Sequence, residues 1–514
     1  MWRDTLAGRF LTDFTQLTDL ACARLGGIVL AANDDFFAPK ENLLKPEKPV
    51  WREHEYTERG KWMDGWETRR RRTPGHDWCI LRLGVPGIVR GVVVDTSFFR
   101  GNFPERCSLE ACALEGTPGV DQLTSPETRW VEILPQSPLA GDAQNRFAIS
   151  DAHRFTHLRL RIYPDGGVAR LRVHGEALPD WRAASAAPGG ELNLAAAQLG
   201  ARVVACSDMF FSAPQNMLMP GKSEGMHDGW ETKRRRGPGH DWAIVQLAIA
   251  GYIQRIELDT SFFKGNFPES CSVELCDVHD STALESAPWK EILHRMKLQG
   301  DTQHVFDEPL VHGDAATHVR LNIFPDGGVA RLRVFGTPTK AGRAAESLRL
   351  LNALLDEAAV ATLRNCCGAT RWAQAMAAAR PFADAEQLRA AAEKCFTDLA
   401  REDWLECFRV HPRIGEKKTA APAESSAAAG WSEQEQAGAR AADAATMAAL
   451  AEVNRAYEAR FGHIFIVCAT GKTPAEMLAA CQQRLANDPE KEIAIAADEE
   501  RRITQLRLEK FLQL

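Results

Sequence analysis

The first two thirds of the chain alternate hydrophobic and polar residues in short runs. Examples are residues 108–112 (SLEAC), 158–162 (LRLRI) and 171–173 (LRV), and turns rich in Gly, Pro and Asp separate such runs, as at 164–167 (PDGG). A period of two places every second side chain on one face, which is typical of strands with one buried face. The pattern therefore predicts antiparallel strands, from which we infer sandwiches of the jelly-roll type.

This β-rich region contains a long internal repeat. Residues 64–112 and 228–276 share the segments DGWET, RRR, PGHDW, DTSFF and GNFP at a constant offset, and residues 156–175 closely match 317–336. A period this long is that of a whole domain, because the units of a solenoid span only about 20–50 residues. We therefore expect two copies of one domain in tandem.

The pattern changes after residues 337–342 (TPTKAG). From there Ala, Leu, Glu and Arg recur at helical spacing, as at Leu348, Leu351 and Leu355, which predicts helices. With 514 residues the chain is also too long for a single hydrophobic core. The predicted fold is multidomain: two tandem all-β jelly-roll sandwiches at 1–180 and 190–340, then an all-α domain at 345–514.

Composition and charge exclude some classes of function. The chain is 45% hydrophobic and 25% charged with a formal net charge of -7, so nothing attracts nucleic acid in general. There is neither a signal-like start nor an apolar stretch of about 18 residues, so we expect a cytoplasmic protein without a membrane partner. The thirteen cysteines are scattered without CxxC pairs, and the adjacent Cys366 and Cys367 cannot chelate a metal as a spaced pair does. The sequence therefore predicts no disulfide framework and no thiolate zinc site.

Each β copy concentrates charge in one block, which reads DGWETRRRRTPGHDW at 64–78. Guanidinium groups bind a small carboxylate bidentately, and neighbouring Asp and His side chains can orient water or move protons. The alternative is a solvated charged hairpin with structural Trp66 and Trp78. The block is copied almost letter for letter, whereas the flanking residues 79–82 and 243–246 have diverged, which favours a chemical role.

The motifs DGWETRRRR, PGHDW, DTSFFxGNFP and PDGGxARLRxxG, each present twice, resemble those of the allantoicase family. The resemblance covers residues 1–340 and implies cleavage of allantoate to (S)-ureidoglycolate and urea. Allantoate carries one carboxylate and two ureido arms, which arginine, amide and acid groups would complement. The resemblance implies Arg70, Arg71, Arg234 and Arg235 as carboxylate ligands, His76, Asp77, His240 and Asp241 as acid–base or metal-binding groups, and Asp95, Asn102, Asp259 and Asn266 in a ligand loop.

Two questions stay open for the duplicated region. A divalent metal such as manganese could use the His and Asp groups, although no metal-ligand spacing is distinctive, and the active copy is not identified. A different class of protein is a galactose-binding-like module that holds a glycan, followed by a helical oligomerisation domain. Fusion to a second ureide-type domain argues against that alternative, and urea release from allantoate would distinguish the two.

Four segments of the helical region carry candidate chemistry: 410–415 (VHPRIG), 431–438 (WSEQEQAG), 461–472 (FGHIFIVCATGK) and 500–508 (ERRITQLRL). Proline disfavours helix for the preceding residue, so we expect His411 at a helix end with its ring free.

Two of these segments also have structural readings. Ser432 can cap a helix with Glu435 at the capping-box position, so that pair has a structural meaning as well. Ile503 and Leu506 are expected to face the core at helical spacing, whereas Arg507 falls off that stripe.

In this order the four segments resemble the OHCU decarboxylase family, whose substrate is 2-oxo-4-hydroxy-4-carboxy-5-ureidoimidazoline and whose product is (S)-allantoin. The resemblance implies an all-helical, cofactor-free enzyme in a homo-oligomer. It departs at 366–372 (CCGATRW), where a Glu-x-Ser-Pro-Trp segment is expected. The runner-up is a helical scaffold that only dimerises the β domains. The implied roles are His411 as acid–base group, Glu435 as its partner, Pro412, Ser432 and Gln436 as substrate-orienting groups, and Arg507 as carboxylate ligand.

Overall fold

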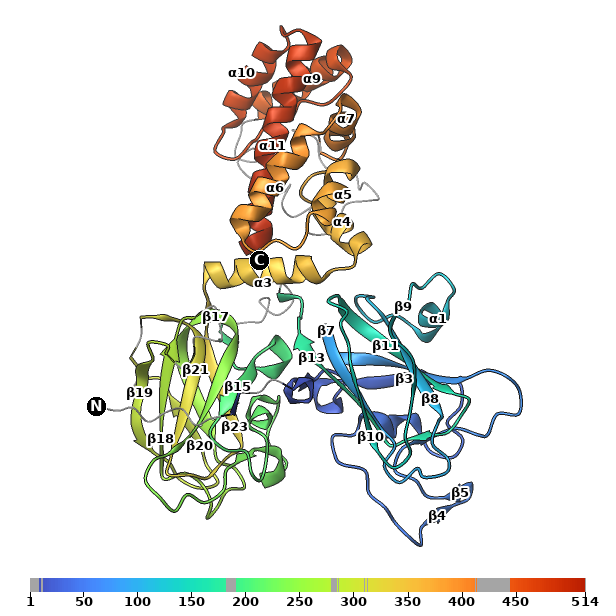
Figure 1. Cartoon of the computed structure of the whole chain (residues 1–514). Helices are drawn as coiled ribbons and strands as arrows, with labels where there is room; N and C mark the ends of the chain where they lie inside the picture. Colours follow the sequence, from blue (N-terminus) through green and yellow to red (C-terminus); the bar gives the residue numbers. More distant parts are fainter. Residues whose placement is uncertain are drawn as a thin grey trace. The chain divides into compact units, whose positions relative to one another are not determined.

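The protein divides into two compact units, Met1–Arg343 and Ala344–Leu514. The computed structural model describes residues 9–10, 13–181, 191–278, 284, 286–308, 310–311, 313–411, 413 and 444–513. The first unit holds two β-sheet domains, blue to teal and green to yellow in Figure 1, and the second unit is helical. The predicted fold class, two all-β sandwiches followed by an all-α domain, is confirmed.

The first β domain is an eight-stranded sheet in the order β2-β13-β7-β11-β8-β9, with β3 and β10 also paired to β7. Its strands are β2 (Thr18–Asp19), β3 (Ile28–Ala32), β7 (Asp77–Asp95), β8 (Arg106–Cys112), β9 (Val131–Pro138), β10 (Gln144–Ala148), β11 (Arg154–Tyr163) and β13 (Arg170–Ala177). Shorter elements are the ribbons β4 (Tyr56–Thr57) with β5 (Gly60–Lys61) and β6 (Trp66–Glu67) with β12 (Gly167–Val168), the helix α1 (Val120–Thr124), and 3-10 turns at Phe14–Gln16, Ala23–Leu25 and Lys40–Leu44.

The long strand β7 makes a sandwich out of this sheet. Its first part pairs with β3 and β11, and its last part pairs with β10 and β13. Between them lies the segment Gly84 to Gly87, which contains Pro86. A side chain at Gly87 would collide with the carbonyl oxygen of Glu176, so the close approach of β13 requires glycine there. One continuous strand therefore serves both layers.

The second β domain repeats this plan around β17. Its strands are β14 (Leu192–Asn193), β15 (Arg202–Cys206), β16 (Trp230–Glu231), β17 (Asp241–Asp259), β18 (Ser270–Cys276), β19 (Lys290–Lys297), β20 (Gln303–Phe306), β21 (Ala315–Phe324), β22 (Gly328–Val329) and β23 (Arg331–Pro338), with 3-10 turns at Ala197–Leu199, Pro214–Leu218 and Met226–Asp228. β1 (Arg9–Phe10) pairs with β15 of this second domain. The apolar residues at alternate positions of β21, Val319, Leu321 and Ile323, are inaccessible to solvent, as the period of two predicts, and His318 and Asn322 on the other face are buried as well.

The helical unit consists of α4 (Asp356–Arg364), α5 (Thr370–Ala378), α6 (Ala385–Thr397), α7 (Arg401–Arg409), α9 (Ala444–Phe461), α10 (Pro474–Arg484) and α11 (Pro489–Gln513), and α3 (Lys340–Ala353) leads into it. Its core contains the aromatic series Trp372, Phe396, Trp404 and Phe408, with successive ring centroids 5.5 to 6.5 Å apart. Thr473 and Glu476 form a capping box, which stabilises the N-terminus of α10. Across the described residues, no helix has the length and apolar character needed to cross a membrane.

Candidate functional sites

The copied motifs of each β domain meet because they pack on one another. β6, in DGWET, pairs with β12, in PDGG, and Arg170 after that turn donates to Asp64 at 2.8 Å. Phe99 of DTSFF is fully buried against the glycines of the same turn. The second copy repeats the arrangement, with Arg331 donating to Asp228 at 2.6 Å. Part of the copied sequence therefore has a structural role. This agrees with the alternative interpretation of the block, in which Trp66 is a structural residue.

One arginine of each predicted carboxylate pair is already bound to an aspartate. Arg71 Nη1 and Asn33 Nδ2 both donate to Asp77 Oδ1, each at 2.7 Å. Asp77 is 1% exposed, and its other oxygen, Oδ2, has no hydrogen-bond partner among the described residues. The neighbouring Arg70 is exposed. A buried, paired Asp77 is suited to holding Arg71 in place rather than to meeting substrate directly.

The second copy has the same ion pair with a different supporting residue. Arg235 Nη2 donates to Asp241 Oδ1 at 2.6 Å, and Ser207 takes the place of Asn33 at 2.9 Å from the same oxygen. Arg234, like its counterpart, is exposed. The Arg–Asp pair therefore does not distinguish the two copies.

His76 differs from its counterpart because its ring is available. The ring centroid lies 5.2 Å from that of Tyr163, and among the described residues neither ring nitrogen has a hydrogen-bond partner. Burial lowers the pKa of His76, and the guanidinium groups of Arg161, Arg71 and Arg159 lower it further. The ring is consequently neutral near pH 7 and can accept a proton.

The surroundings of His76 include outward-facing residues of β11 that the sequence motifs do not mark. Arg159 Nε and Arg161 Nη2 lie 2.6 and 2.9 Å from the same atom, Glu110 Oε2. Arg161 Nε is buried without a hydrogen-bond partner among the described residues. Tyr163 follows on the same face, with its hydroxyl 3.0 Å from that of Ser108. The alternation in LRLRIY could have shown that these side chains share a face, but not that the face adjoins His76.

His240, in contrast, is engaged by side chains of its own domain. Its Nε2 lies 3.2 Å from Asn322 Oδ1, and its ring centroid is 4.6 Å from that of Phe324. Asn322 also donates to Glu274 at 2.8 Å, as Arg320 does at 2.6 Å. Burial again lowers the pKa of His240. The two copies therefore have similar backbones, but the side chains around the histidine differ. The first copy has two arginines beside one glutamate, whereas the second has one arginine and an asparagine beside its glutamate.

The predicted ligand loop is held by local hydrogen bonds in both copies. The aspartates Asp95 and Asp259 each accept the backbone N–H two residues further on at 2.8 Å. The asparagines Asn102 and Asn266 donate to the glutamate of DGWET at 2.7 and 2.6 Å. These four residues shape the loop, and the structure gives them no separate cluster around a ligand.

The His and Asp groups of the β domains do not fit a manganese site. Asp77 and Asp241 each share an oxygen with an arginine, which competes with a cation for the carboxylate. In the part of the chain that the structure describes, the one convergence of three or more His, Cys, Asp or Glu ligand atoms lies in the helical unit. We therefore derive no chemical step through a metal here.

In the helical unit His411 lies just after α7 and faces Glu500 of α11. Its Nε2 is 2.8 Å from Glu500 Oε2, although neither atom makes an aligned hydrogen bond to a described residue. Cys407 Sγ donates to the other oxygen of Glu500 at 3.2 Å. Burial lowers the pKa of His411, but the Glu500 carboxylate and Cys407 outweigh burial and raise it to about 9. The expectation of a free ring was wrong, and the partner that the sequence did not reveal is Glu500.

Arg507 lies on the same side of α11 as Glu500. It is 4% exposed, and its guanidinium is close enough to His411 to oppose the rise of that pKa. It is therefore buried toward His411, as a carboxylate ligand there requires. Leu506 is half-buried and packs against the hydrophobic core of the helical unit, as expected. The remaining candidates, Pro412, Ser432, Glu435 and Gln436, lie outside the described residues.

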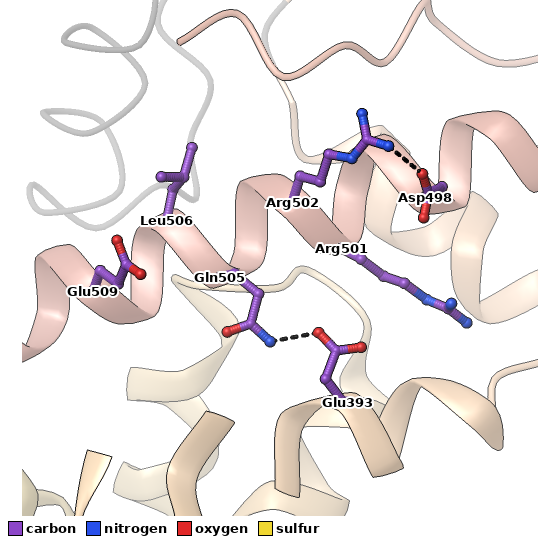
Figure 2. A pocket seen from close by; sticks show the side chains of 7 residues that line it. All are labelled: Glu393, Asp498, Arg501, Arg502, Gln505, Leu506 and Glu509. Atoms are coloured by element: carbon purple, nitrogen blue, oxygen red, sulfur yellow. Dashed lines mark hydrogen bonds and ion pairs between the residues drawn. The ribbon is translucent and has the colours of Figure 1, made fainter. Parts of the chain in front are cut away.

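A pocket of about 430 Å³ lies on another face of α11, as Figure 2 shows. Gln505 donates to Glu393 of α6 at 2.6 Å, and Arg502 pairs with Asp498 at 2.8 Å. These side chains bind one another, and the pocket contains none of the candidate residues of the decarboxylase motifs. The pocket is therefore separate from the His411 site.

Comparison with known proteins agrees with the duplicated β fold. The allantoicase repeat model matches residues 18–178 and 192–339. A probable allantoicase of Pseudomonas paraeruginosa is 50% identical over 63% of this chain and 97% of its own length, and the allantoicase of Dictyostelium discoideum is 46% identical over 62% and 87%. The crystal structure of allantoicase from Saccharomyces cerevisiae is similar with a TM-score of 0.53, at 34% identity over 64% of this chain and 99% of that one.

The helical unit matches a second family, since residues 352–509 fit the OHCU decarboxylase model. Fold and sites together define a two-part enzyme, a duplicated β-sandwich hydrolase joined to a helical lyase. The chain belongs to the allantoicase family and carries an OHCU decarboxylase domain in addition. It is a bifunctional enzyme of purine catabolism, and the alternatives of a sugar-binding module and a helical scaffold are set aside.

Proposed function

We propose that allantoate is cleaved at His76 of the first β domain and that the second domain lacks this activity. The observation that carries the proposal is the difference between the two histidines. Among the described residues the His76 ring has no hydrogen-bond partner, whereas His240 Nε2 is engaged by Asn322. A base must reach the proton that it removes. Both ring nitrogens of His76 are available for that task, whereas the contact with Asn322 leaves only Nδ1 of His240.

Charge also favours the first domain for an anionic substrate. Around His76, Arg159 and Arg161 share one carboxylate, that of Glu110, which leaves an excess of one positive charge. Around His240, Arg320 is balanced by Glu274, and Asn322 replaces the second arginine. A guanidinium with an unpaired Nε can bind the allantoate carboxylate. Arg161 is the residue that we assign to that task.

The reaction replaces one ureido arm of allantoate by a hydroxyl group. The carbon–nitrogen bond to that arm breaks, the oxygen of water joins the carbon, and a proton of the water goes to the nitrogen that leaves as urea. Neutral His76 accepts the proton from water and returns it to the departing nitrogen, which is ordinary acid–base catalysis. Arg71, held by Asp77, adds positive charge beside the developing negative charge.

The test compares His76→Ala with His240→Ala in the full chain. The first variant should lose urea release by about a hundredfold or more, the usual effect of removing an acid–base group, and the second should retain it. Decarboxylation of OHCU by both variants provides the control for an intact protein. Equal loss in the two variants, or a loss confined to His240→Ala, would overturn the assignment.

For the helical unit we infer that His411 is the acid that protonates the carbanion left when CO₂ departs from OHCU. Its raised pKa keeps the ring protonated at neutral pH, and Glu500 balances the charge. Arg507 supplies the positive charge for the substrate carboxylate. The electrons of the broken bond delocalise into the imidazoline ring, so these residues account for the reaction without a cofactor.

Two further expectations stay predictions: a cytoplasmic location and a homo-oligomeric state. Whether a divalent metal such as manganese takes part in allantoate cleavage is tested by assaying urea release from chelator-treated protein with and without added Mn²⁺.

A further inference from the structure

A cluster of buried cysteine, glutamate and histidine side chains surrounds the acid of the decarboxylase unit. Cys367 Sγ lies 3.5 Å from Cys407 Sγ, and Cys407 Sγ lies 3.2 Å from Glu500 Oε1. His411 Nε2 is 2.8 Å from the other oxygen of Glu500. Cys367, Cys407 and Glu500 present their ligand atoms within 4.8 Å of one another, and all three are inaccessible to solvent.

We propose that Cys367, Cys407 and Glu500 bind one thiophilic divalent cation, for which Zn²⁺ is the best fit, with His411 as fourth ligand. This set cannot be recognised from the sequence, because the cysteines come from two segments and no pair has the usual spacing of a zinc motif. Packing of α7 beside the segment that precedes α5 brings them together. A bound ion would occupy His411 and stop decarboxylation. This inhibition rests on the function proposed for His411, whereas binding of the ion does not depend on that function.

The distances suit a tetrahedral ion. Zinc–sulfur bonds of about 2.3 Å and zinc–oxygen or zinc–nitrogen bonds of about 2.0 Å place two sulfurs roughly 3.8 Å apart, sulfur and oxygen roughly 3.5 Å apart, and oxygen and nitrogen roughly 3.3 Å apart. The corresponding separations in the protein are 3.5, 3.2 and 2.8 Å. These three separations are shorter than the tetrahedral values by about 0.3 to 0.5 Å, and the ligand atoms of Cys367, Cys407 and Glu500 all lie within 4.8 Å of one another.

The remaining two ligand atoms already face each other. Glu500 Oε2 and His411 Nε2 are both buried and lie 2.8 Å apart as an ion pair, and among the described residues neither atom has a further hydrogen-bond partner. A cation at the cluster would therefore bind both atoms in place of their contact with each other.

Charge and access are compatible with an ion. Binding releases the two thiol protons and the imidazolium proton of His411 to solvent, so Zn²⁺ with two thiolates, one carboxylate and the neutral His411 ring carries one net negative charge. The Arg507 guanidinium, which already acts on His411, compensates that charge. The side chain of His411 is 9% exposed, whereas that of Glu500 is inaccessible, so an ion would enter past the histidine.

The experiment uses the full chain, treated with a chelator, kept reduced with a phosphine and titrated with Co²⁺. A near-ultraviolet band from thiolate-to-cobalt charge transfer and the visible bands of a tetrahedral ion are expected at one equivalent, and Zn²⁺ should abolish them. Cys367→Ser and Cys407→Ser should each lose most of the charge-transfer intensity. Cys366→Ser is the matched control, since Cys366 is equally buried beside Cys367 but outside the cluster, and it should behave as the parent protein does.

Zn²⁺ should also inhibit decarboxylation of the parent and of Cys366→Ser at least tenfold, reversibly with chelator, and should leave Cys367→Ser uninhibited. Urea release reports an intact β region throughout, and circular dichroism confirms that the helical unit of each variant is folded. The proposal is overturned if Co²⁺ gives no charge-transfer band or if the band survives in both cysteine variants. It is also overturned if mass spectrometry shows a Cys367–Cys407 disulfide that persists after treatment with the phosphine. A clear cobalt band without inhibition leaves the ion site standing and refutes the role of His411.

Discussion

Glu500, on the last helix of the chain, approaches the ring of His411 to 2.8 Å, and nothing in the segment 500–508 that contains it predicts this contact. The carboxylate is inaccessible to solvent, and its second oxygen is held by Cys407. A buried carboxylate beside an imidazole stabilises the protonated ring, which explains why the pKa of His411 is raised in spite of burial. The acid of the decarboxylase thus depends on a residue far from it in sequence.

Replacing Glu500 should alter the pH dependence of decarboxylation. Glu500→Gln removes the charge that raises the pKa of His411, so the limb of the rate profile due to His411 should move to lower pH and kcat at pH 8 should fall. His411→Ala should reduce kcat by about a hundredfold or more at every pH. Stopped assays of OHCU decay across pH 6 to 9 measure both effects. Unchanged urea release in the same preparations is the control, and an unshifted profile for Glu500→Gln would contradict the pairing.

The fold follows from the sequence more readily than the sites do. Alternation in β11 and helical spacing in α11 identify the two classes of domain because burial follows the period of each element. The same reasoning fails at Glu500 and Arg507. Their charges predict exposed positions, but both side chains are buried. Charged groups enter a core only when partners from distant segments meet them, and a hydrophobic pattern contains no information about those partners.

The difference between the β domains was visible in the aligned copies but could not be interpreted there. Arg161 corresponds to Asn322 and Tyr163 to Phe324, and such changes on a strand are common. They gain meaning only when the sheet places them beside His76 and His240. The copied letters include the shared scaffold and the histidine itself, and the letters that differ set the surroundings of His76 and His240.

Arg161→Asn gives the first domain the residue of the second and should weaken binding of allantoate. Loss of a charge-assisted contact corresponds to roughly 1.5–3 kcal/mol, or about a 10- to 150-fold rise in KM, with a smaller change in kcat. Tyr163→Phe is the matched control, since it also copies the second domain but leaves the charge unchanged. Initial rates of urea release over a range of allantoate concentrations separate KM from kcat. A normal KM in Arg161→Asn would show that the carboxylate binds elsewhere.

The buried pair of Arg170 and Asp64 should be essential for the stability of the first domain. Both side chains are nearly inaccessible, and Arg170→Met leaves the buried aspartate with only the backbone N–H of Val50 at 3.0 Å and the half-exposed Lys45 at 3.6 Å. Breaking such a pair costs about 3–5 kcal/mol of the free energy of unfolding. Urea denaturation followed by tryptophan fluorescence measures the change. Arg100→Met removes the exposed pair with Asp142 and should leave the transition where it is; similar shifts in the two variants would contradict the argument.

Two buried histidines should make the β domains sensitive to acid. His157 and its counterpart His318 are 1% and 2% exposed, and burial lowers the pKa of each to about 4. In the unfolded chain these rings titrate near pH 6.5, so below that pH the unfolded state binds more protons and is favoured. The stability present above pH 6.5 is therefore lost as the pH falls toward 4, by up to about 3 kcal/mol for each histidine. His157→Gln cannot take up the proton, so its free energy of unfolding should change less between pH 7.5 and 4.5 than that of the parent protein. Urea denaturation at several pH values tests this, with His54→Gln, at an exposed position, as the matched control; an identical pH dependence in parent and His157→Gln would exclude His157 as a source of acid sensitivity.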